Sequence, residues 1–190
     1  MASKSAQPSL GLVGQAPPAG SHTTKLRRSS AALDSHISLS IRVESAMSED
    51  SAQLVQDSQS ALLEHLPANE IFSLESQELA APNVTLFVAR WNGKPVGCVA
   101  LVDDTNYGEV KRLYVHKDMR GRGIAAELMV ALENYCRDIG LLSVRLETSP
   151  ALAEAVALYR AMGYRTCGRF GDYPEVDSSL FMERSLGSLC

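Results

Sequence analysis

The sequence predicts an α+β fold with a mixed, mostly antiparallel central sheet flanked by helices. Three strand-like segments follow one another without a helix between residues 83 and 116, whereas helices and strands alternate only after residue 123. Strands joined by short turns pair antiparallel, and a doubly wound parallel sheet would instead need a helix after every strand. Two further strand segments, 164–170 and 179–183, flank the loop 171–175 and are expected to form a final antiparallel pair.

The folded part begins with a strand followed by a helix. Apolar and polar residues alternate through Ile37–Val43, which is the period of a half-buried strand. Ser48 is suited to an N-cap, and Glu49 and Asp50 place negative charge in the first helical turn, where the helix dipole favours it. The apolar stripe of this helix consists of Leu54, Val55, Leu62 and Leu66. A shorter helical stretch is expected over 69–79.

Three strands fill the middle of the chain. The segments 83–91 and 95–102 flank Asn92-Gly93, a dipeptide that favours a two-residue hairpin turn. A third strand is expected over 107–116. The alternation in the second and third strands assigns three residues to the core, namely Val99, Leu101 and Val115.

A long helix follows the loop 120–123 and is expected to end at Gly140. Its apolar residues recur at helical spacing and are Ile124, Leu128, Leu132, Tyr135 and Ile139. Cys136 lies on the same side of this helix and is assigned to the core. A strand over 142–147 and a helix over 150–163, which opens on a proline, complete the alternating part.

Residues 1–36 differ from the rest of the chain. They are rich in Ser, Ala, Gly and Pro and lack a sustained apolar period, which predicts a disordered tail. The segment is also basic and almost free of acidic residues, as transit peptides are, and a leader added for expression is a third alternative. Pro17-Pro18 interrupts any helix there, so a tail or leader ranks above an import signal. Residues 37–190 are expected to form one domain.

Composition excludes several functional classes. The net charge is −4 and the N-terminal tail is basic, so the remainder is acidic, which argues against nucleic-acid binding. An acidic surface that keeps the protein in solution is the first interpretation of this charge, and a cationic substrate such as an amine ranks after it. The sequence contains no run of about 18 apolar residues, so no membrane-spanning helix is predicted. The four cysteines form no C-x-x-C pair and the histidines lack metal-ligand spacing, so we expect no metal site and reduced thiols in the cytoplasm.

The segment Arg120–Ala125 has the pattern of a phosphate-binding loop. Glycine lets the backbone approach a phosphate without a clashing Cβ. The first N–H groups of the following helix have no partner within the helix, and the helix dipole favours an anion there. Arg120 and Arg122 add positive charge. The loop is therefore predicted to bind a pyrophosphate.

Two common pyrophosphate motifs do not fit this loop. It matches neither G-x-x-x-x-G-K-[ST] nor a G-x-G-x-x-G after a first strand, so a nucleoside-triphosphate loop and a dinucleotide fold are disfavoured. It does match R-x-x-G-x-A at Arg120, Gly123 and Ala125. With the preceding strand Val-Lys-Arg-Leu-Tyr-Val, the helix end Ala-Leu-Tyr-Arg-Ala-Met-Gly-Tyr and the closing Phe-Gly-Asp-Tyr-Pro-Glu, the chain resembles the GNAT superfamily of N-acetyltransferases, particularly a bacterial subgroup of small domains. The resemblance covers roughly 39–186 and is strongest over 107–164.

The resemblance implies acetyl-CoA as co-substrate and direct transfer of the acetyl group to a primary amine in a ternary complex, with no metal. The pantetheine arm would pair like an added strand with a central strand that is splayed from its neighbour, through the backbone of Leu113, Tyr114 and Val115. The pyrophosphate would bind the loop and the helix start, through Arg120, Gly121, Arg122, Gly123, Ile124 and Ala125. A backbone N–H near Val115 would polarise the thioester carbonyl.

Two catalytic roles also follow from the resemblance. Tyr159 corresponds to the tyrosine that protonates the departing thiolate, although its apolar neighbours alone would indicate a core residue. Glu109, eleven residues before Arg120, corresponds to the general base of the histone-acetylating members. A glutamate in solvent or paired with Lys111 is an equally weighted alternative. Other carboxylates that could line the amine site are Glu70, Asp103 and Asp104.

One position departs from the family pattern. Many members carry Asn or Gln seven residues before the helix tyrosine, where it contacts the coenzyme, and here that position is Leu152. We expect one polar contact with the coenzyme to be lost and coenzyme affinity to be lower, which does not by itself argue against catalysis.

Alternative functions stay open at this point. A non-catalytic acyl-CoA-binding or regulatory module would keep the 120–125 loop but lack a working acid and base, and a generic α+β ligand-binding domain would need the motif to be accidental. The acceptor could be a small amine, an amino acid or a protein N-terminus, and the segments 48–79 and 171–177 are expected to shape its pocket. The terminal strand pair leaves a sheet edge, through which a homodimer could form.

Overall fold

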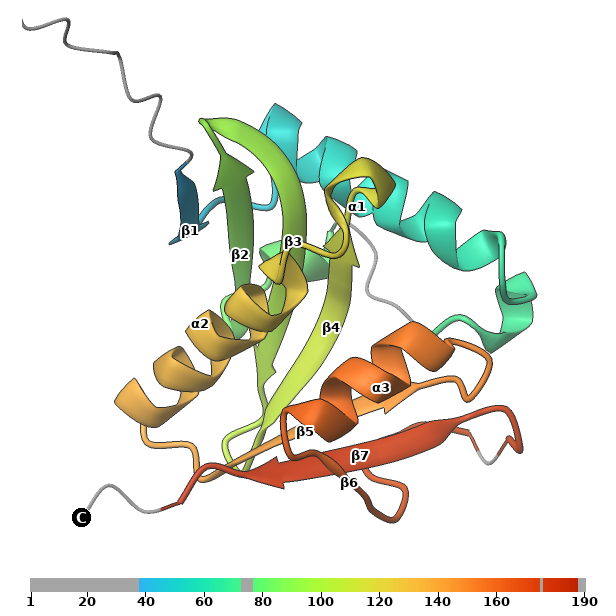
Figure 1. Ribbon diagram of the computed structural model, residues 1–190. Coiled ribbons are helices and arrows are strands. Elements are labelled where there is room, and N and C mark those ends of the chain that lie inside the picture. Colours follow the sequence, from blue (N-terminus) through green and yellow to red (C-terminus); the bar gives the residue numbers. More distant parts are fainter. Residues whose placement is uncertain (1–37, 73–76, 175, 188–190) are drawn as a thin grey trace, which may run out of the picture. The chain divides into compact units, whose positions relative to one another are not determined.

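Seven strands form one sheet in the part of the chain that the computed structural model describes, residues 38–72, 77–174 and 176–187 (Figure 1). Their spatial order is β1-β2-β3-β4-β5-β7-β6. The strands are β1 Leu39–Val43, β2 Val84–Trp91, β3 Lys94–Asp103, β4 Gly108–Val115, β5 Ser143–Thr148, β6 Arg165–Thr166 and β7 Leu180–Ser185. Every neighbouring pair is antiparallel except β4 with β5, which confirms the predicted α+β class.

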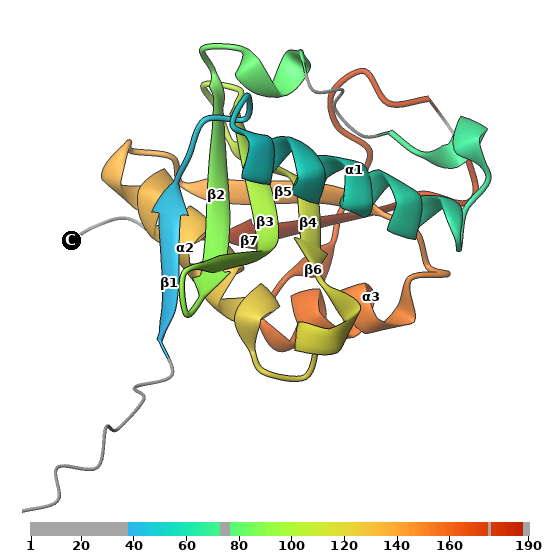
Figure 2. The same cartoon turned by 90° about the horizontal axis from the view of Figure 1, so that it is seen from above.

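Helices cover both faces of the sheet. The α-helices are α1 Glu49–Leu63, α2 Ile124–Asp138 and α3 Ala153–Ala161, and the short 3₁₀ helices are η1 Ala68–Glu70, η2 Glu78–Ala80 and η3 Lys117–Met119. Helix α1 lies on one face, whereas α2 and α3 lie on the other (Figures 1 and 2). No described helix is long and apolar enough to cross a membrane. The tail expected over 1–36, and the boundary after it, lie outside the described residues.

Local signals place several elements as expected. The hydroxyl of Ser48 accepts a hydrogen bond from the Ser51 N–H and caps α1. The β2–β3 turn is confirmed, since Asn92 and Gly93 have φ of +50° and +83°, the left-handed pair that a two-residue hairpin requires. Asn92 also accepts the backbone N–H of Ser38 at its Oδ1, which ties the turn to the start of β1.

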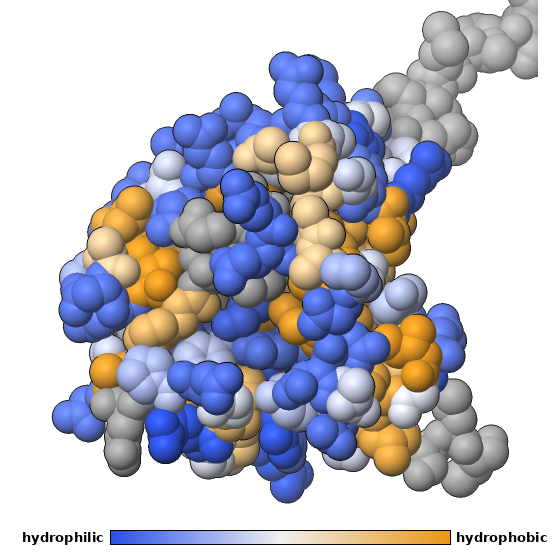
Figure 3. Space-filling view, turned by 180° about the vertical axis from the view of Figure 1, so that it is seen from behind, coloured by the Kyte–Doolittle hydropathy of each residue, from blue (hydrophilic) through white to orange (hydrophobic). Residues whose placement is uncertain are grey.

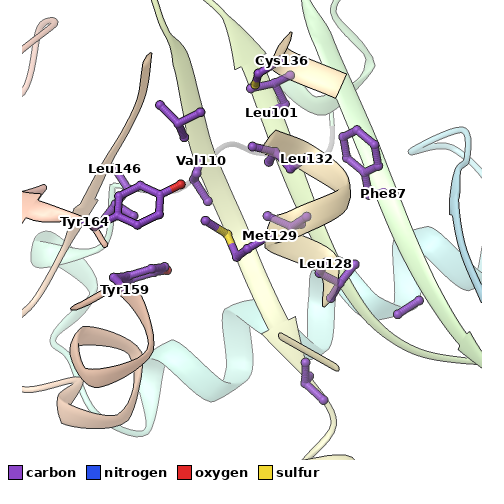
Figure 4. Close-up of a cluster of buried hydrophobic side chains, with 14 of the residues drawn as sticks. Phe87, Leu101, Val110, Leu128, Met129, Leu132, Cys136, Leu146, Tyr159 and Tyr164 are labelled. Atoms are coloured by element: carbon purple, nitrogen blue, oxygen red, sulfur yellow. The ribbon is translucent and has the colours of Figure 1, made fainter. Parts of the chain in front are cut away.

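The larger core lies between the sheet and α2 (Figure 4). Its residues include the predicted Val99, Leu101 and Val115, and Cys136 is fully buried, as expected. The prediction that Ile139 continues the apolar stripe is wrong, because Ile139 is the C-cap of α2 and is exposed. A second core, between the sheet and α1, contains Leu54, Val55, Leu79, Leu86, Val88, Cys98 and Ala100.

Three element predictions need correction. The stretch over 69–79 is not one helix in its described part, because η1 gives way at Ile71 to extended backbone and η2 is a separate turn. Helix α3 begins at Ala153 rather than at Pro150, since a turn in which the Leu152 N–H bonds the Ser149 carbonyl precedes it.

Strand β6 is much shorter than the predicted segment 164–170. It pairs with β7 over two residues, and the Cys167 N–H then donates one more hydrogen bond to the Phe181 carbonyl. Phe170 instead packs edge-to-face on Tyr107, with ring centroids 5.3 Å apart. The chain leaves the sheet here because the aromatic side chains bury more apolar surface in a separate cluster than on an edge strand.

Candidate active site

Strands β4 and β5 separate part-way along their length. Their parallel pairing runs from Gly108 with Val144 to Val110 with Leu146, whereas β4 continues to Val115. The predicted splay of the central strands is therefore present. Beyond the last pair, the edge of β4 that faces β5 is available to another hydrogen-bonding partner.

A bulge turns β4 away from β5. The register with β3 shifts between Cys98 and Ala100, and opposite this shift Arg112 has a φ of +56°. Such a conformation costs a non-glycine residue about 1–3 kcal/mol and persists only where the surroundings hold it. The buried Arg112 side chain donates to Oε1 of Gln59 on α1 at 2.8 Å, and its carbonyl accepts from Cys98 Sγ at 3.5 Å. Packing against α1 thus stabilises the bend that opens the gap.

A cavity of about 580 Å³ lies at this gap. Its walls come from the second half of α1, the end of β4, the loop into α2 and the start of α3. Eight of the residues predicted to contact coenzyme A line it, namely Leu113, Tyr114, Val115, Arg120, Gly121, Gly123, Ile124 and Ala125. The strand edge and the loop are therefore brought together at one site, as pantetheine and pyrophosphate binding would require.

The loop before α2 has the geometry of an anion cradle. Gly121 and Gly123 have φ of +72° and +79°, a region that side chains disfavour, and Gly123 is the N-cap of α2. No atom outside the adjoining residues lies within 4 Å of a Cβ built at either glycine, so the cradle has room for a ligand. Arg120 stays close to the strand, because its Nε donates to the Val115 carbonyl at 3.2 Å. A pyrophosphate group fits this arrangement.

Arg122 is the one predicted coenzyme residue that does not line the cavity. Its guanidinium lies over the ring of Trp91 on β2, 5.5 Å from the ring centroid. A cation above the face of an indole is attracted by the ring quadrupole. The loop is thereby tied to β2 by one of its two arginines.

Tyr159 does not line the cavity. Its side chain is buried in the α2-side core, where its ring contacts that of Tyr164 with centroids 5.8 Å apart (Figure 4). The neighbouring Leu158 lines the cavity instead. Burial raises the pKa of Tyr159 far above its usual range, and the carboxylate of Glu147 raises it further. The phenol therefore holds its proton at any physiological pH.

A buried ionic network supports this part of the core. The carboxylate of Glu133, on α2, is almost fully buried and accepts from the Tyr164 hydroxyl at 3.0 Å. Arg184, on β7, donates to both of its oxygens, at 2.6 and 2.8 Å. The charge of Glu133 is thereby compensated, and α2, β7 and the end of α3 are fixed relative to one another.

Glu109 lies on β4 but not in the cavity wall. Its Oε1 lies 2.9 Å from the ammonium of Lys111, and it also accepts the hydroxyl proton of Tyr173. Both partners of the pair are only 13% exposed. The structure thus contains the pair of Glu109 with Lys111, which was one of the alternatives given for Glu109.

Glu147, on β5, is a carboxylate that the sequence interpretation missed. It accepts the Ser179 hydroxyl at 2.7 Å, and burial raises its pKa although that hydrogen bond and Lys111 lower it. It also acts electrostatically on the phenol of Tyr159. A signal was present: Glu147 ends a strand whose parallel neighbour carries the coenzyme motif, and ligands bind where the carboxyl ends of such strands meet.

The departure at Leu152 also lies at the cavity. Leu152 lines it and is the N-cap of α3, without a side-chain capping bond.

The face of the molecule that carries α1 is mostly hydrophilic, and apolar side chains appear there in separate groups (Figure 3).

A splayed and bulged strand beside a glycine-bearing helix start is the arrangement that the resemblance to acetyl-CoA-dependent transferases predicts, and comparison with known proteins agrees with it. The chain belongs to the acetyltransferase (GNAT) family, whose model matches residues 50–164. The IAA acetyltransferase of Azospirillum brasilense is 38% identical over 150 residues, which are 78% of this chain and 98% of that protein.

Solved structures show the same architecture. A Klebsiella pneumoniae protein assigned as an acyl-CoA N-acyltransferase is 30% identical, with a TM-score of 0.66 over 78% of this chain and 98% of its own. The PaiA N-acetyltransferase of Thermoplasma acidophilum, solved in complex with coenzyme A, has a TM-score of 0.63 over 78% and 99%. At 18% identity, that second likeness establishes the shared fold alone.

Proposed function

We propose that this chain is an N-acetyltransferase that moves the acetyl group of acetyl-CoA directly to a primary amine in a ternary complex. The observation that carries the proposal is the gap between β4 and β5, where one cavity is lined by the edge of β4, the glycine cradle and the start of α3. Membership of the GNAT family supports acetyl transfer, and the acidic groups at the gap support a cationic acceptor.

The coenzyme is assigned to the 580 Å³ cavity. The N–H groups at the start of α2 and the side chain of Arg120 hold the pyrophosphate, and the open edge of Leu113–Val115 pairs with the pantetheine arm. When bound, acetyl-CoA supplies an activated thioester, so the reaction calls for no redox step and no covalent enzyme intermediate.

Glu147 is the preferred general base. An ammonium acceptor must lose a proton before its nitrogen can attack the thioester carbonyl, and a carboxylate whose pKa is raised by burial takes that proton more readily than an ordinary one. Glu109 is the alternative base, but its carboxylate is already engaged by Lys111 and Tyr173.

Tyr159 is the proposed general acid. As the new C–N bond forms and the C–S bond breaks, the phenol gives its proton to the departing sulfur, and a backbone N–H near Val115 polarises the carbonyl oxygen. Burial keeps the phenol protonated, so the Tyr159 proton is present when the sulfur departs. A movement of the side chain or coenzyme has to bring the hydroxyl to the sulfur, since Tyr159 is buried and does not line the cavity.

The test combines binding with turnover. Purified protein is titrated with acetyl-CoA by calorimetry, and thiol release is measured with phenethylamine, lysine, spermidine, an alanine-initiated peptide and IAA. Saturable binding with amine-dependent thiol release supports the proposal. A Glu147→Gln/Tyr159→Phe double variant should keep binding and lose turnover. Acetylation of IAA without acetylation of any amine would overturn the amine assignment, and absence of acetyl-CoA binding at millimolar concentration would overturn the whole proposal.

A non-catalytic acyl-CoA-binding module is the second candidate function. The burial of Tyr159 and its absence from the cavity wall favour it. That function predicts tight acetyl-CoA binding with no thiol release above the rate of the double variant, so the same experiment separates the two.

A further inference from the structure

Lys111 connects three segments that are distant in sequence. Its ammonium donates a hydrogen bond to the Phe72 carbonyl at 3.1 Å, in the connection after α1, and another to the Tyr173 hydroxyl, in the connection between β6 and β7. It also pairs with Glu109 on its own strand, at 2.9 Å. Because Tyr173 in turn donates to Glu109, the three polar groups form a closed ring of interactions.

Aromatic packing encloses this ring. The ring of Tyr173 meets those of Phe72, Phe170 and Phe181 edge-on, with centroids 5.8, 5.5 and 5.4 Å apart. The Lys111 ammonium also lies 4.4 Å from the centroid of the Tyr173 ring. The three N–H donors of Lys111 are therefore engaged in a largely dry environment, so this ammonium is suited to holding the protein together rather than to binding a substrate anion.

The ring adjoins the reacting groups but not the coenzyme cavity. None of Glu109, Lys111 and Tyr173 lines that cavity. Glu109 pairs with Arg145 on the parallel strand β5, so Lys111 and Glu147 each lie two residues further along, on the same face of the sheet. The charges of Lys111 and Glu109 accordingly act on Glu147, which in turn acts on the phenol of Tyr173. The ring therefore borders the gap on the side from which an acceptor would reach Glu147.

We infer that Lys111, Glu109 and Tyr173 form a latch that fastens Phe72 and the 170–174 segment to β4, and that these residues serve acceptor binding rather than proton transfer. This inference rests on the proposed function, since it assigns the role of acceptor wall to the two fastened segments. Glu109 is then a positioning residue. Because Glu109 is paired with Lys111, the protein can carry a glutamate at this position on β4 and still use Glu147 on β5 as the base.

Electrostatics give the latch a second measurable property. The groups that act on Glu147 are Lys111 and Glu109 on β4 and Ser179 before β7, and Glu147 itself acts on Tyr159 and Tyr173. Lys111 lowers the pKa of Glu147 and Glu109 raises it. Removing the two charges singly should consequently move the acid limb of the pH–rate profile in opposite directions, upwards for Lys111→Met and downwards for Glu109→Gln.

The experiment uses the full chain and the best acceptor from the amine screen. The variants are Lys111→Met, Lys111→Arg, Tyr173→Phe and Glu109→Gln, and the control is Lys94→Met, which alters an exposed lysine in the β2–β3 hairpin. Loss of one charged hydrogen bond from the latch should raise the acceptor KM about tenfold, with kcat changed less and acetyl-CoA affinity unchanged. Lys111→Arg should recover part of the loss. Amide hydrogen exchange over 170–174 should quicken in Lys111→Met and Tyr173→Phe but not in Lys94→Met.

The outcomes separate the latch from the proposed function. If wild-type protein acetylates nothing, the proposed function fails, and hydrogen exchange still decides whether Lys111 and Tyr173 hold the 170–174 segment. Unchanged exchange and unchanged acceptor KM in Tyr173→Phe, the mildest variant, would overturn the latch. A collapse of kcat in Glu109→Gln at constant acceptor KM would also overturn it, in favour of Glu109 as the base.

Discussion

The two sides of the gap, to which we assign the coenzyme and the acceptor, are built in different ways. The coenzyme side uses one continuous stretch, 113–125, whose backbone groups are placed by two left-handed glycines and a helix start. The acceptor side gathers the side chains of Phe72, Lys111, Glu147 and Tyr173 from separate elements, through tertiary packing. Backbone placement is a local property, whereas a side-chain cluster exists only once the sheet has formed. Substitutions on the two sides should therefore affect different steps.

The largest effect is expected on the coenzyme side. An Arg122→Glu/Gly123→Glu double variant places two carboxylates at an anion cradle and forces a side chain into φ +79°. Acetyl-CoA affinity should fall about 100-fold or more, because both the helix-dipole term and the backbone geometry are lost. Calorimetry measures the loss.

A matched control exists in the same chain. Gly93→Glu/Lys94→Glu makes a closely similar change in charge at a glycine of φ +83°, in the β2–β3 hairpin, where a Cβ meets nothing within 4 Å. Its acetyl-CoA affinity should match that of the parent. Equal losses in the two double variants would mean that instability, and not the cradle, accounts for the effect.

The acceptor side is tested most sharply at Glu147. Glu147→Gln keeps the shape and the Ser179 contact but removes the base, so kcat should fall about 10²- to 10⁴-fold while acetyl-CoA affinity stays constant. Glu147 acts as a base only when it is ionised. Because burial raises its pKa, the activity of the parent protein should rise with pH, with a midpoint above the usual glutamate pKa of about 4.3. That acid limb should disappear in the variant. Glu127→Gln, on the exposed face of α2, is the control.

Tyr159→Phe should have a smaller effect. A thiolate is a moderately good leaving group even unprotonated, so loss of the acid should lower kcat about tenfold, less than the usual range for general acid catalysis. The control is Tyr135→Phe, which alters a phenol on α2 that packs edge-to-face on Phe87, with centroids 5.6 Å apart. An unaltered pH–rate profile and kcat in Tyr159→Phe would show that Tyr159 is not the general acid.

The contrast between the two sides also explains what the sequence could predict. The cradle was predictable because glycine conformations, an arginine and a helix start are encoded within six residues, 120–125. A catalytic role for Tyr159 is predicted only by resemblance, since its apolar neighbours indicate the core in which it does lie. The sequence left open whether Glu109 pairs with Lys111. The pairing could be anticipated because residues two apart on a strand point to the same face whatever the tertiary fold.

Other features had no local signal. The contact between Lys111 and Tyr173 joins positions 62 residues apart, and the one between Lys111 and Phe72 joins positions 39 apart. The early end of β6 follows from the packing of Phe170 on Tyr107, and nothing in the alternation of 164–170 indicates it. The bulge at Arg112 is likewise a tertiary feature, since arginine has no preference for a positive φ and is held there by Gln59.

The smallest expected effect concerns Leu152, where the coenzyme side departs from its family. Leu152→Asn puts an amide into the cavity wall at the N-cap of α3, which has no side-chain capping bond. Asparagine is a favoured N-cap, so the melting temperature should rise by a few degrees, corresponding to about 0.5–1 kcal/mol. If the amide also contacts the coenzyme, acetyl-CoA should bind about threefold to tenfold more tightly, the worth of one neutral hydrogen bond. Leu152→Ser separates the two effects, because serine caps the helix equally well but is too short to reach far into the cavity. Equal gains in affinity from Asn and Ser would show that the cap, acting on the cavity wall, improves binding, whereas a gain from Asn alone would show that a lost polar contact had been restored.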